Sequence, residues 1–233
     1  MNPRKLLIVG GSQGLGRELA AHYAGKGAEV IVSGRDFAKA QAAAREIGGK
    51  TSALAFDLAS PEGIHVALES LDGLDSLVLT AIDRDDNRIA SYNIARAVYL
   101  TTMKLVGYTT VIHELLPRFP KEGGAIVLYG GLAKDRPYPG STTVTTVNGG
   151  ITTMIHSLAG QIAPTRINAI HPGIVGDSPY WKGKGDYLKT IEARTPGGKL
   201  VTMKDIVHAT AFLLENDGIN GENIKVDRGW MTM

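Results

Sequence analysis

Short apolar runs alternate with longer amphipathic stretches along the whole chain. The apolar runs predict strands over residues 6–9, 29–33, 52–56, 75–80, 125–129, 166–170 and 223–226. The stretches between them predict helices over 15–26, 37–47, 90–116 and 205–214. Fully apolar strands that alternate with helices are typical of a parallel sheet covered on both faces. We therefore predict one α/β domain over residues 1–233, with a doubly wound parallel sheet in a three-layer αβα arrangement.

Local signals refine some of these elements. Ser60 is the expected N-cap of a further helix that has Pro61 at its first position. Pro117 is expected to end the long helix of residues 90–116. The segment 142–155 is rich in Thr, Val and Gly, which are poor helix formers, so propensity alone does not predict a helix there.

A glycine-rich turn follows the first predicted strand. It reads Gly-Gly-Ser-Gln-Gly-Leu-Gly over residues 10–16. Such a turn between a strand and a helix lets the backbone approach a pyrophosphate, and the next helix directs its free N–H groups at it. The context predicts a Rossmann-type dinucleotide site with these candidate residues: Gly10, Ser12, Gln13, Gly14, Leu15 and Gly16.

The end of the second strand bears on the choice of cofactor. An NAD site usually has an acid there for the ribose hydroxyls, but this chain has Arg35. A guanidinium suits a 2′-phosphate, so NADP(H) is favoured over NAD(H). Ser12 and Arg17 are possible additional polar contacts. Asp36 is the alternative, as a ribose-binding acid one residue late.

Composition limits the classes of function. The 233 residues are 43% hydrophobic, with a net charge of +2 and no cysteine. One substantial core is expected, with no disulfide or thiolate nucleophile. The balanced charge gives no reason to expect nucleic acid or a membrane surface as a partner. The six histidines lack metal-ligand spacing, so no metal site is predicted. The apolar runs are too short to span a bilayer, and the N-terminal run is too short for a signal peptide. We therefore expect a cytoplasmic protein.

Four motifs together resemble the short-chain dehydrogenase/reductase family over nearly the full chain. Gly10, Gly14 and Gly16 fit its Gly-x-x-x-Gly-x-Gly loop, and the other motifs cover residues 56–58, 166–173 and 221–230. The resemblance implies a homodimer or homotetramer and a lid at about residues 174–202. It also implies further cofactor contacts from Asp57, Leu58, Thr80, Ala81, Pro172, Gly173, Val175 and Ser178. Asp177 stands where the family often has a cofactor-binding Thr, but the neighbouring Ser178 is chemically closer.

The resemblance also implies a changed catalytic centre. The family uses Ser, Tyr and Lys, often with Asn; the Tyr is the acid or base and the Ser holds the substrate oxygen. Alignment of the motifs places Gly131 (or Gly130) at the Ser, Val144 at the Tyr, Asn148 at the Lys and Lys104 at the Asn. Segment 142–155 then corresponds to the family's catalytic helix. Two substitutes are conceivable: Tyr138 as a replacement acid, and Lys104 displaced into the pocket.

Several polar residues near these positions are interpreted as structural. Tyr129 is expected to be a packed residue at a strand end. Lys134, Asp135 and Arg136 are expected to be solvated loop charges, and the cluster Asp83, Asp85 and Asp86 a solvated turn.

The leading hypothesis is an NADP(H)-dependent oxidoreductase with a non-standard acid/base centre. It would act on a carbonyl, an alcohol or a similar activated acceptor. Tyr180 and Trp181 in the lid favour a small apolar or aromatic substrate. Two alternatives stay open: a non-catalytic NADP(H)-binding sensor or regulatory protein, and a non-redox isomerase or cyclase on the same scaffold.

Overall fold

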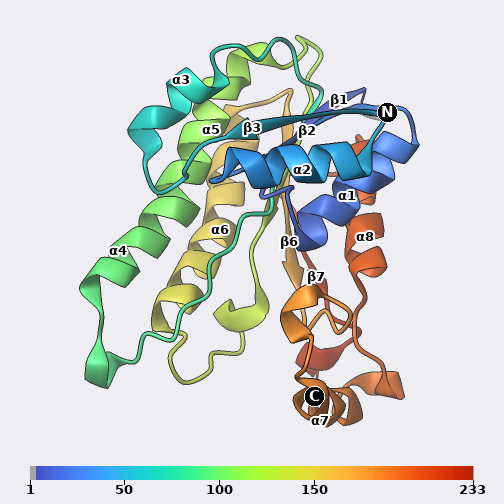
Figure 1. Cartoon of the computed structure of the whole chain (residues 1–233). Helices are drawn as coiled ribbons and strands as arrows, with labels where there is room; N and C mark the ends of the chain where they lie inside the picture. Colours follow the sequence, from blue (N-terminus) through green and yellow to red (C-terminus); the bar gives the residue numbers. More distant parts are fainter. Residues whose placement is uncertain (1–3, 233) are drawn as a thin grey trace.

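A computed structural model describes residues 4–232 (Figure 1). Within them, parallel strands form one seven-stranded sheet in the order β3-β2-β1-β4-β5-β6-β7. The strands are β1 Lys5–Val9, β2 Glu29–Gly34, β3 Lys50–Ala55, β4 Ser76–Leu79, β5 Ala125–Tyr129, β6 Arg166–Pro172 and β7 Asn223–Val226. The order reverses between β1 and β4, and in such sheets ligands bind beside the carboxyl ends of the strands at that point. The predicted doubly wound α/β fold is confirmed.

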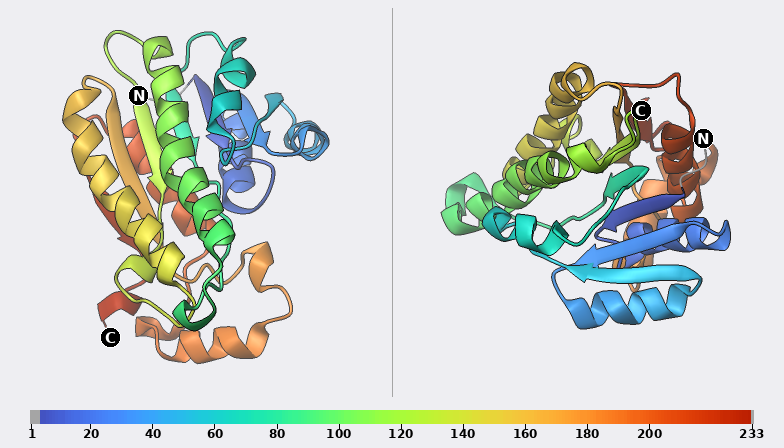
Figure 2. Two further views of the ribbon diagram at one scale, coloured as in Figure 1. Left: turned by 90° about the vertical axis from the view of Figure 1, so that its left-hand side faces the viewer. Right: turned by 90° about the horizontal axis from the view of Figure 1, so that it is seen from above.

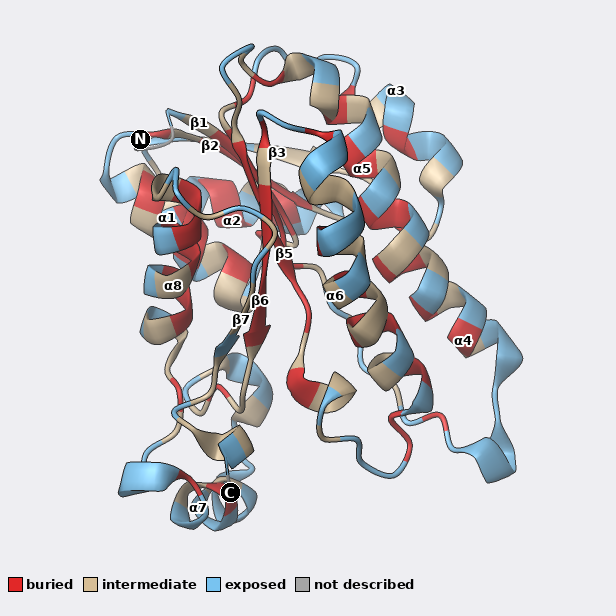
Figure 3. Cartoon of the chain, turned by 180° about the vertical axis from the view of Figure 1, so that it is seen from behind, coloured by how far each residue is buried: buried red, intermediate tan, exposed pale blue. Residues whose placement is uncertain are grey.

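Helices cover both faces of the sheet, as the strand sequences require (Figure 2). They are α1 Gly14–Gly25, α2 Phe37–Ile47, α3 Ile64–Leu68, α4 Ile94–Thr101, α5 Gly107–Leu115, α6 Thr142–Gln161, α7 Gly185–Ala193 and α8 Met203–Glu215. Alternate strand residues face opposite cores: Leu7 packs with α3 to α6, whereas Leu6 packs with α1, α2 and α8. Figure 3 shows the resulting buried centre of the sheet between half-exposed helices.

The helix α6 forms in spite of its composition. Val147, Ile151 and Ile155 are buried and recur every four residues, so one face packs on the sheet core. The hydroxyl of Thr146 donates to the carbonyl oxygen of Thr142 at 2.9 Å, one turn back. Tertiary packing therefore outweighs the poor propensity, and the family resemblance predicted this element better than local composition did.

Two predicted helices differ from the observed ones. The helix expected from residue 90 begins at Ile94, because the side chain of Asn93 caps it by accepting the N–H of Arg96 at 2.9 Å. It is also interrupted by a π-helical turn at Thr102–Val106. After Ser60 the chain forms a 3₁₀ turn, Pro61–Gly63, before α3 begins, and the Ser60 side chain makes no capping bond.

The segment 174–202 forms a separate lobe beyond the carboxyl edge of the sheet (Figure 1). Its two ends are held together, since Val175 and Val201 form a β-bridge and the N–H of Gly176 donates to the Val201 oxygen at 2.9 Å. Across residues 4–232, no helix is both long and apolar enough to cross a bilayer.

Candidate functional site

The glycine turn after β1 packs backbone against backbone. Gly10 has φ +86°, a left-handed conformation that favours glycine. A Cβ on Gly10 would lie 2.8 Å from the amide nitrogen of Ala81. A Cβ on Gly16 would lie 2.7 Å from Oγ1 of Thr80 and closer still to the carbonyl oxygen of Gly10. Side chains are thus excluded, and the turn lies directly against the residues that follow β4.

The amino end of α1 is free to receive an anion. Gln13 precedes the helix without a side-chain capping bond, and the first turn holds no acidic residue. Gly14 has φ +55°, and a Cβ added there would meet nothing within 4 Å. Unpaired N–H groups and the positive end of the helix dipole favour a phosphate at such a position. Leu15 packs inward against the core shared with β1 and β2.

The side chains after β2 separate the two candidates for the ribose position. Arg35 is exposed, and its guanidinium donates to the hydroxyl of Tyr99 at 2.6 Å. Asp36 is instead the N-cap of α2, where its carboxylate accepts the N–H of Lys39 at 3.0 Å. Asp36 thus has a structural task that holds its side chain, whereas Arg35 projects from the sheet edge.

The two additional candidates for polar contacts differ in position. Arg17 forms an ion pair with Glu46 of α2 at 2.6 Å, so its guanidinium is engaged within the protein and does not serve the expected ligand. Ser12 remains beside the end of β2, since a Cβ on Gly34 would lie 3.2 Å from its Oγ.

The remaining predicted contacts border the same edge of the sheet. The Asp57 carboxylate accepts the N–H of Ala59 at 2.9 Å, which orders the turn after β3, and Leu58 is buried. The Thr80 hydroxyl donates to the Val9 oxygen at 3.0 Å and so ties β4 to β1.

The chain after β6 supplies the other side of this edge. The N–H of Gly173 donates to the Val226 oxygen at 2.9 Å, so the turn after Pro172 stays close to β7. Val175 is buried. The Asp177 carboxylate accepts the N–H of Met203 at 2.8 Å, at the start of α8. Asp177 is thereby occupied in capping, which leaves Ser178 as the better candidate for a ligand contact.

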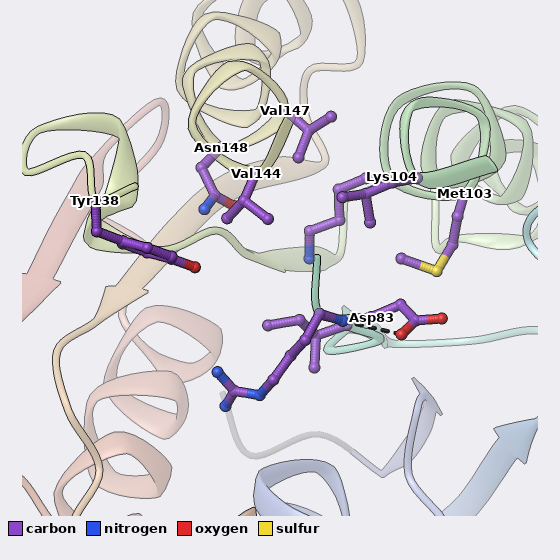
Figure 4. Close-up of a pocket in the computed structure, with 10 residues that line it drawn as sticks. Asp83, Met103, Lys104, Tyr138, Val144, Val147 and Asn148 are labelled. Atoms are coloured by element: carbon purple, nitrogen blue, oxygen red, sulfur yellow. Dashed lines mark hydrogen bonds between the residues drawn. The ribbon is translucent and has the colours of Figure 1, made fainter. Parts of the chain in front are cut away.

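A small cavity of about 40 Å³ lies between α4, α6 and the loops after β4 and β5 (Figure 4). Three of the residues predicted at catalytic positions line it: Lys104, Val144 and Asn148. Tyr138 also lines it, with its phenol oxygen pointing toward the other side chains (Figure 4). The remaining lining residues are Ile82, Asp83, Arg84, Leu100, Met103 and Val147. The fold therefore brings the sequence-predicted centre together.

Lys104 is a buried cation within this group. Its side chain comes from the π-helical turn and is only 3% exposed. Nζ donates to the carbonyl oxygens of Ala81 at 3.0 Å and Tyr129 at 2.6 Å, and to the Tyr108 hydroxyl at 2.9 Å. The ammonium thus joins the carboxyl ends of β4 and β5. Burial lowers the pKa of Lys104 to about 7.

Gly131 lies against the side chain of Asn148. A Cβ on Gly131 would be 2.9 Å from Nδ2 of Asn148. The N–H of Gly131 donates to Nδ1 of His171 at 3.2 Å, and Nε2 of His171 bonds Oδ1 of Asn223 at 2.9 Å. Because His171 is fully buried, its pKa is lowered, and it acts as a neutral acceptor behind the turn.

The two tyrosines near the cavity differ. The Tyr129 ring is buried in the opposite core, where its hydroxyl bonds Thr210 at 2.6 Å, so the expected structural role is confirmed. Tyr138 is 51% exposed, and partial burial raises the pKa of its phenol. A phenol of raised pKa stays protonated at neutral pH, so Tyr138 is a weak acid at the rim of the cavity.

The acidic cluster after β4 is only in part the solvated turn that composition indicated, since Asp86 is exposed but Asp83 and Asp85 lie against Arg96. Asp83 lines the cavity and pairs with Arg96 at 2.9 Å; burial raises the pKa of Asp83, but Arg96 outweighs it and holds the pKa below its usual value. The Asp85 side chain is only 3% exposed and lies 3.6 Å from Arg96. The sequence analysis did not consider Arg96, in the first turn of the following helix, as an ion-pair partner for these carboxylates. Lys134 and Asp135 likewise form an ion pair, at 2.9 Å.

Arg84, which the sequence did not single out, connects the cavity to the lobe 174–202. Its guanidinium lies 3.2 Å from the centroid of the Tyr180 ring, and Lys184 lies 3.7 Å from the same ring. Trp181 stacks on Tyr187 with 5.3 Å between ring centroids. Arg84 thus holds the lobe against the loop after β4, whereas Lys184 and the stacked rings order the lobe itself.

Comparison with known proteins decides the family. A family model described as Enoyl-(Acyl carrier protein) reductase matches residues 9–231, nearly the whole chain. The chain belongs to the short-chain dehydrogenase/reductase family. Members of this family use nicotinamide cofactors, act on small molecules and are commonly oligomeric.

Relatives within the short-chain dehydrogenase/reductase family include reductases of known type. The chain is 28% identical to the human 3-oxoacyl-[acyl-carrier-protein] reductase, with 95% of each chain covered. The fold matches the MalC reductase/Diels-Alderase from Malbranchea aurantiaca with a TM-score of 0.92 at 20% identity, covering 100% of this chain and 97% of that one. It also matches L-sorbose reductase from Gluconobacter frateurii, complexed with NADPH and L-sorbose, with a TM-score of 0.90 at 22% identity, covering 98% and 97%. The sequence-based assignment to this family is confirmed.

Proposed function

We propose that the protein is an NADP(H)-dependent oxidoreductase whose acid/base centre departs from the family pattern. The observation that carries the cofactor assignment is the glycine cradle: Gly10 and Gly16 leave no room for side chains, beside an uncapped helix end. A turn without side chains beside free N–H groups fits a pyrophosphate. The residues that would hold the cofactor are Gly10, Ser12, Gln13, Gly14, Leu15, Gly16, Arg35, Asp57, Leu58, Thr80, Ala81, Pro172, Gly173, Val175 and Ser178.

The preference for NADP(H) rests on the contrast between Arg35 and Asp36. Asp36 is held as the cap of α2, which argues against its role as a ribose-binding acid. Arg35 is exposed beside the ribose position that the family resemblance implies, with Tyr99 to orient its guanidinium. A guanidinium and a phosphate form charge-assisted, paired hydrogen bonds.

The non-standard centre follows from the residues around the cavity. Gly131, Val144 and Asn148 take the places of the family's Ser, Tyr and Lys, and none can donate a proton as a phenol does. Loss of a general acid costs about a hundred- to ten-thousand-fold in rate. The bound cofactor would supply the hydride. This chain would then orient an activated acceptor that needs little acid help, with its apolar part against Leu100, Met103 and the lid aromatics.

The cofactor assignment is tested by titrating the protein with NADPH and NADH and following fluorescence. Replacement of Arg35 by Leu should weaken NADPH binding by about ten- to a hundredfold and leave NADH binding unchanged, as expected for one charge-assisted contact. Arg45→Leu, which removes an exposed arginine from α2, is the matched control. Equal losses for both cofactors would contradict the role of Arg35. A screen of ketones, quinones and imines for NADPH consumption tests the redox function.

Two other functions are separated by the same measurements. Tight NADPH binding without turnover of any acceptor would favour a sensor or regulatory protein. Conversion of a substrate without net NADPH consumption would favour a non-redox isomerase or cyclase. The MalC protein, a reductase and Diels-Alderase, shows that this fold accommodates a cycloaddition. We favour the redox function because the matching family model and the human relative are both described as reductases.

We also propose self-association as a homodimer or homotetramer. The outer faces of α5 and α6 run side by side (Figure 2) and border an open groove of about 830 Å³. Apolar and polar residues line this groove: Leu105, Val106, Thr109, Thr110, His113, Gly150, Thr153, Met154 and Ser157. Light scattering at several protein concentrations measures the assembly.

A further inference from the structure

Within residues 4–232, the buried ammonium of Lys104 has hydrogen bonds but no counter-ion. Its three acceptors are two backbone carbonyls and a phenol. Among the ion pairs formed within residues 4–232, none includes Lys104. Asp83, the acid that lines the same cavity, is already paired with Arg96. Arg84 adds a second positive charge to the wall. The cavity is therefore a positively charged site.

The cavity is the size of a small polar group. Its volume is about 40 Å³, and one water molecule needs about 10–15 Å³ of such a cavity. A carbonyl oxygen with the atoms bonded to it therefore fits, with the rest of the acceptor toward Tyr138 and the lid. Half of the residues in the wall are apolar: Ile82, Leu100, Met103, Val144 and Val147. A low-polarity wall strengthens the interaction of a charge with anything bound there.

We propose that Lys104 supplies the positive charge that stabilises a negative oxygen on the acceptor as hydride arrives. This role, which rests on the proposed oxidoreductase function, selects the substrate class. The acceptor is a neutral conjugated carbonyl, such as a quinone or an α,β-unsaturated ketone, whose oxygen becomes negative on reduction. An iminium acceptor is already positive and is disfavoured beside Lys104 and Arg84.

The electron balance accounts for the missing tyrosine. A hydride with its electron pair, supplied by the bound reduced nicotinamide, would form a C–H bond on a carbon of the conjugated acceptor. A pair of π electrons would move onto the carbonyl oxygen, which becomes an enolate. The nicotinamide would be oxidised, and the acceptor reduced by two electrons. Solvent would protonate the enolate after release, and for a quinone it would also carry the proton from the new C–H carbon to oxygen that gives the hydroquinone, so no side chain has to give up a proton in the hydride step. Below about pH 7 Lys104 is protonated, and it keeps its proton through the hydride step and acts through charge.

The first experiment compares Lys104→Gln with the wild type. A glutamine amide still donates two N–H bonds to the carbonyls of Ala81 and Tyr129 but carries no charge, so it separates charge from structure. With NADPH, kcat/KM for a quinone should fall by about a hundredfold, the cost of losing one oxyanion-stabilising group. The value for a cyclic iminium should be unchanged or higher. Lys134→Gln, in which the lost charge was already paired with Asp135, should alter neither. Equal effects of Lys104→Gln on both acceptors would overturn the proposal.

The second experiment needs no turnover and can use the wild type alone. Pentafluorophenol is ionised at neutral pH, and pentafluoroaniline is its neutral counterpart; their binding to the NADP(H)-loaded protein is followed by fluorine NMR. Phenolate affinity should fall at least about tenfold as pH rises through about 7, where Lys104 loses its proton. Aniline affinity should stay constant. In Lys104→Gln, phenolate binding should be weak and independent of pH.

The other groups around the cavity do not titrate over that range in a way that imitates Lys104. Burial raises the pKa values of Tyr108, Tyr129 and Tyr138, burial lowers that of His171, and Arg96 keeps Asp83 ionised. If phenolate affinity does not change with pH and is the same in the wild type and in Lys104→Gln, the role of Lys104 is overturned. Phenolate binding as expected, with no acceptor reduced, would instead refute the proposed oxidoreductase function and leave the charged site standing.

Discussion

The carboxyl edge of the sheet is built in two different ways on its two sides. Beside β1, glycines meet mostly backbone: Gly10 faces the amide of Ala81, and Gly16 faces the carbonyl of Gly10. Beside β5, glycines meet side chains: Gly130 faces the ring of His171, and Gly131 faces the amide of Asn148. Backbone cannot be exchanged by mutation, whereas side chains can. The β1 side is therefore tightly constrained, and the β5 side is open to replacement of its chemistry on a retained scaffold.

The largest expected effect concerns the stability of the β5 side. Burial lowers the pKa of Lys104 from 10.5 to about 7 in the folded protein. Between these values the unfolded chain holds a proton that the folded chain lacks, so this group makes wild-type stability rise with pH. Below about pH 7 the full cost of the buried charge is present. Lys104→Met should thus be most stable relative to the wild type at or below that pH, and its advantage should shrink toward pH 10.5.

Urea unfolding of both proteins at several pH values measures this difference. At its steepest it should change by about 1.4 kcal/mol per pH unit, the value for one proton. In Lys104→Met the carbonyl of Tyr129 loses the Lys104 donor, whereas that of Ala81 keeps the Tyr108 hydroxyl. The lost hydrogen bonds lower the stability of the variant by an amount that does not depend on pH. Lys121→Met, at an exposed position, controls for the loss of a lysine. A stability difference that stays flat with pH would show that the Lys104 ammonium is not destabilised by burial.

The next effect tests the constraint on the β1 side. In Gly16→Ala the new methyl group would press on the Gly10 carbonyl and on Oγ1 of Thr80, so α1 must move away from the turn. Overpacking of this kind costs about 1–3 kcal/mol of stability. NADPH affinity should fall by at least about tenfold, because the phosphate-facing N–H groups move with the helix.

Gly25→Ala is the matched control on the same helix. A Cβ at Gly25 meets nothing within 4 Å, so stability and NADPH binding should be unchanged or slightly improved. Thermal unfolding and a fluorescence titration of both variants make the comparison. If Gly16→Ala bound NADPH as well as Gly25→Ala does, the close backbone approach would not be part of the cofactor site.

The contrast also explains how much the sequence could predict. The β1 side was predictable because strand, glycine turn and helix are contiguous in sequence and their spacing reflects steric limits on the backbone. The sequence predicted Asp36 only as an alternative ligand for the ribose. Its capping role depends on where α2 begins, because its carboxylate accepts the N–H of Lys39 in the first turn.

On the β5 side the sequence predicted which family residues are absent and offered Lys104 and Tyr138 as substitutes, but it did not predict their contacts. The positions 131, 144 and 148 could be aligned, but nothing local shows that Lys104 reaches one carbonyl after β4 and another at the end of β5. That contact depends on a π-helical turn and on strand pairing across distant segments. The ion pair between Asp83 and Arg96 was missed for a related reason, because composition does not reveal where a loop folds back on a helix.

The smallest expected effect concerns the return of a family residue to the β5 side, the serine at position 131. Gly131 has an extended backbone, φ 179°, which any residue can adopt, so only Asn148 opposes a side chain there. Gly131→Ser should cost about 1 kcal/mol, and Asn148→Ala added to it should recover most of that loss, with a coupling of about 0.5–1 kcal/mol between the two sites. Gly149→Ala, which meets open space on the same helix as Asn148, should be neutral. Urea unfolding of the single and double variants gives the coupling. If the losses of stability in the two single variants simply add in the double variant, the backbone and not the Asn148 side chain opposes the serine. The β5 side would then be as constrained as the β1 side.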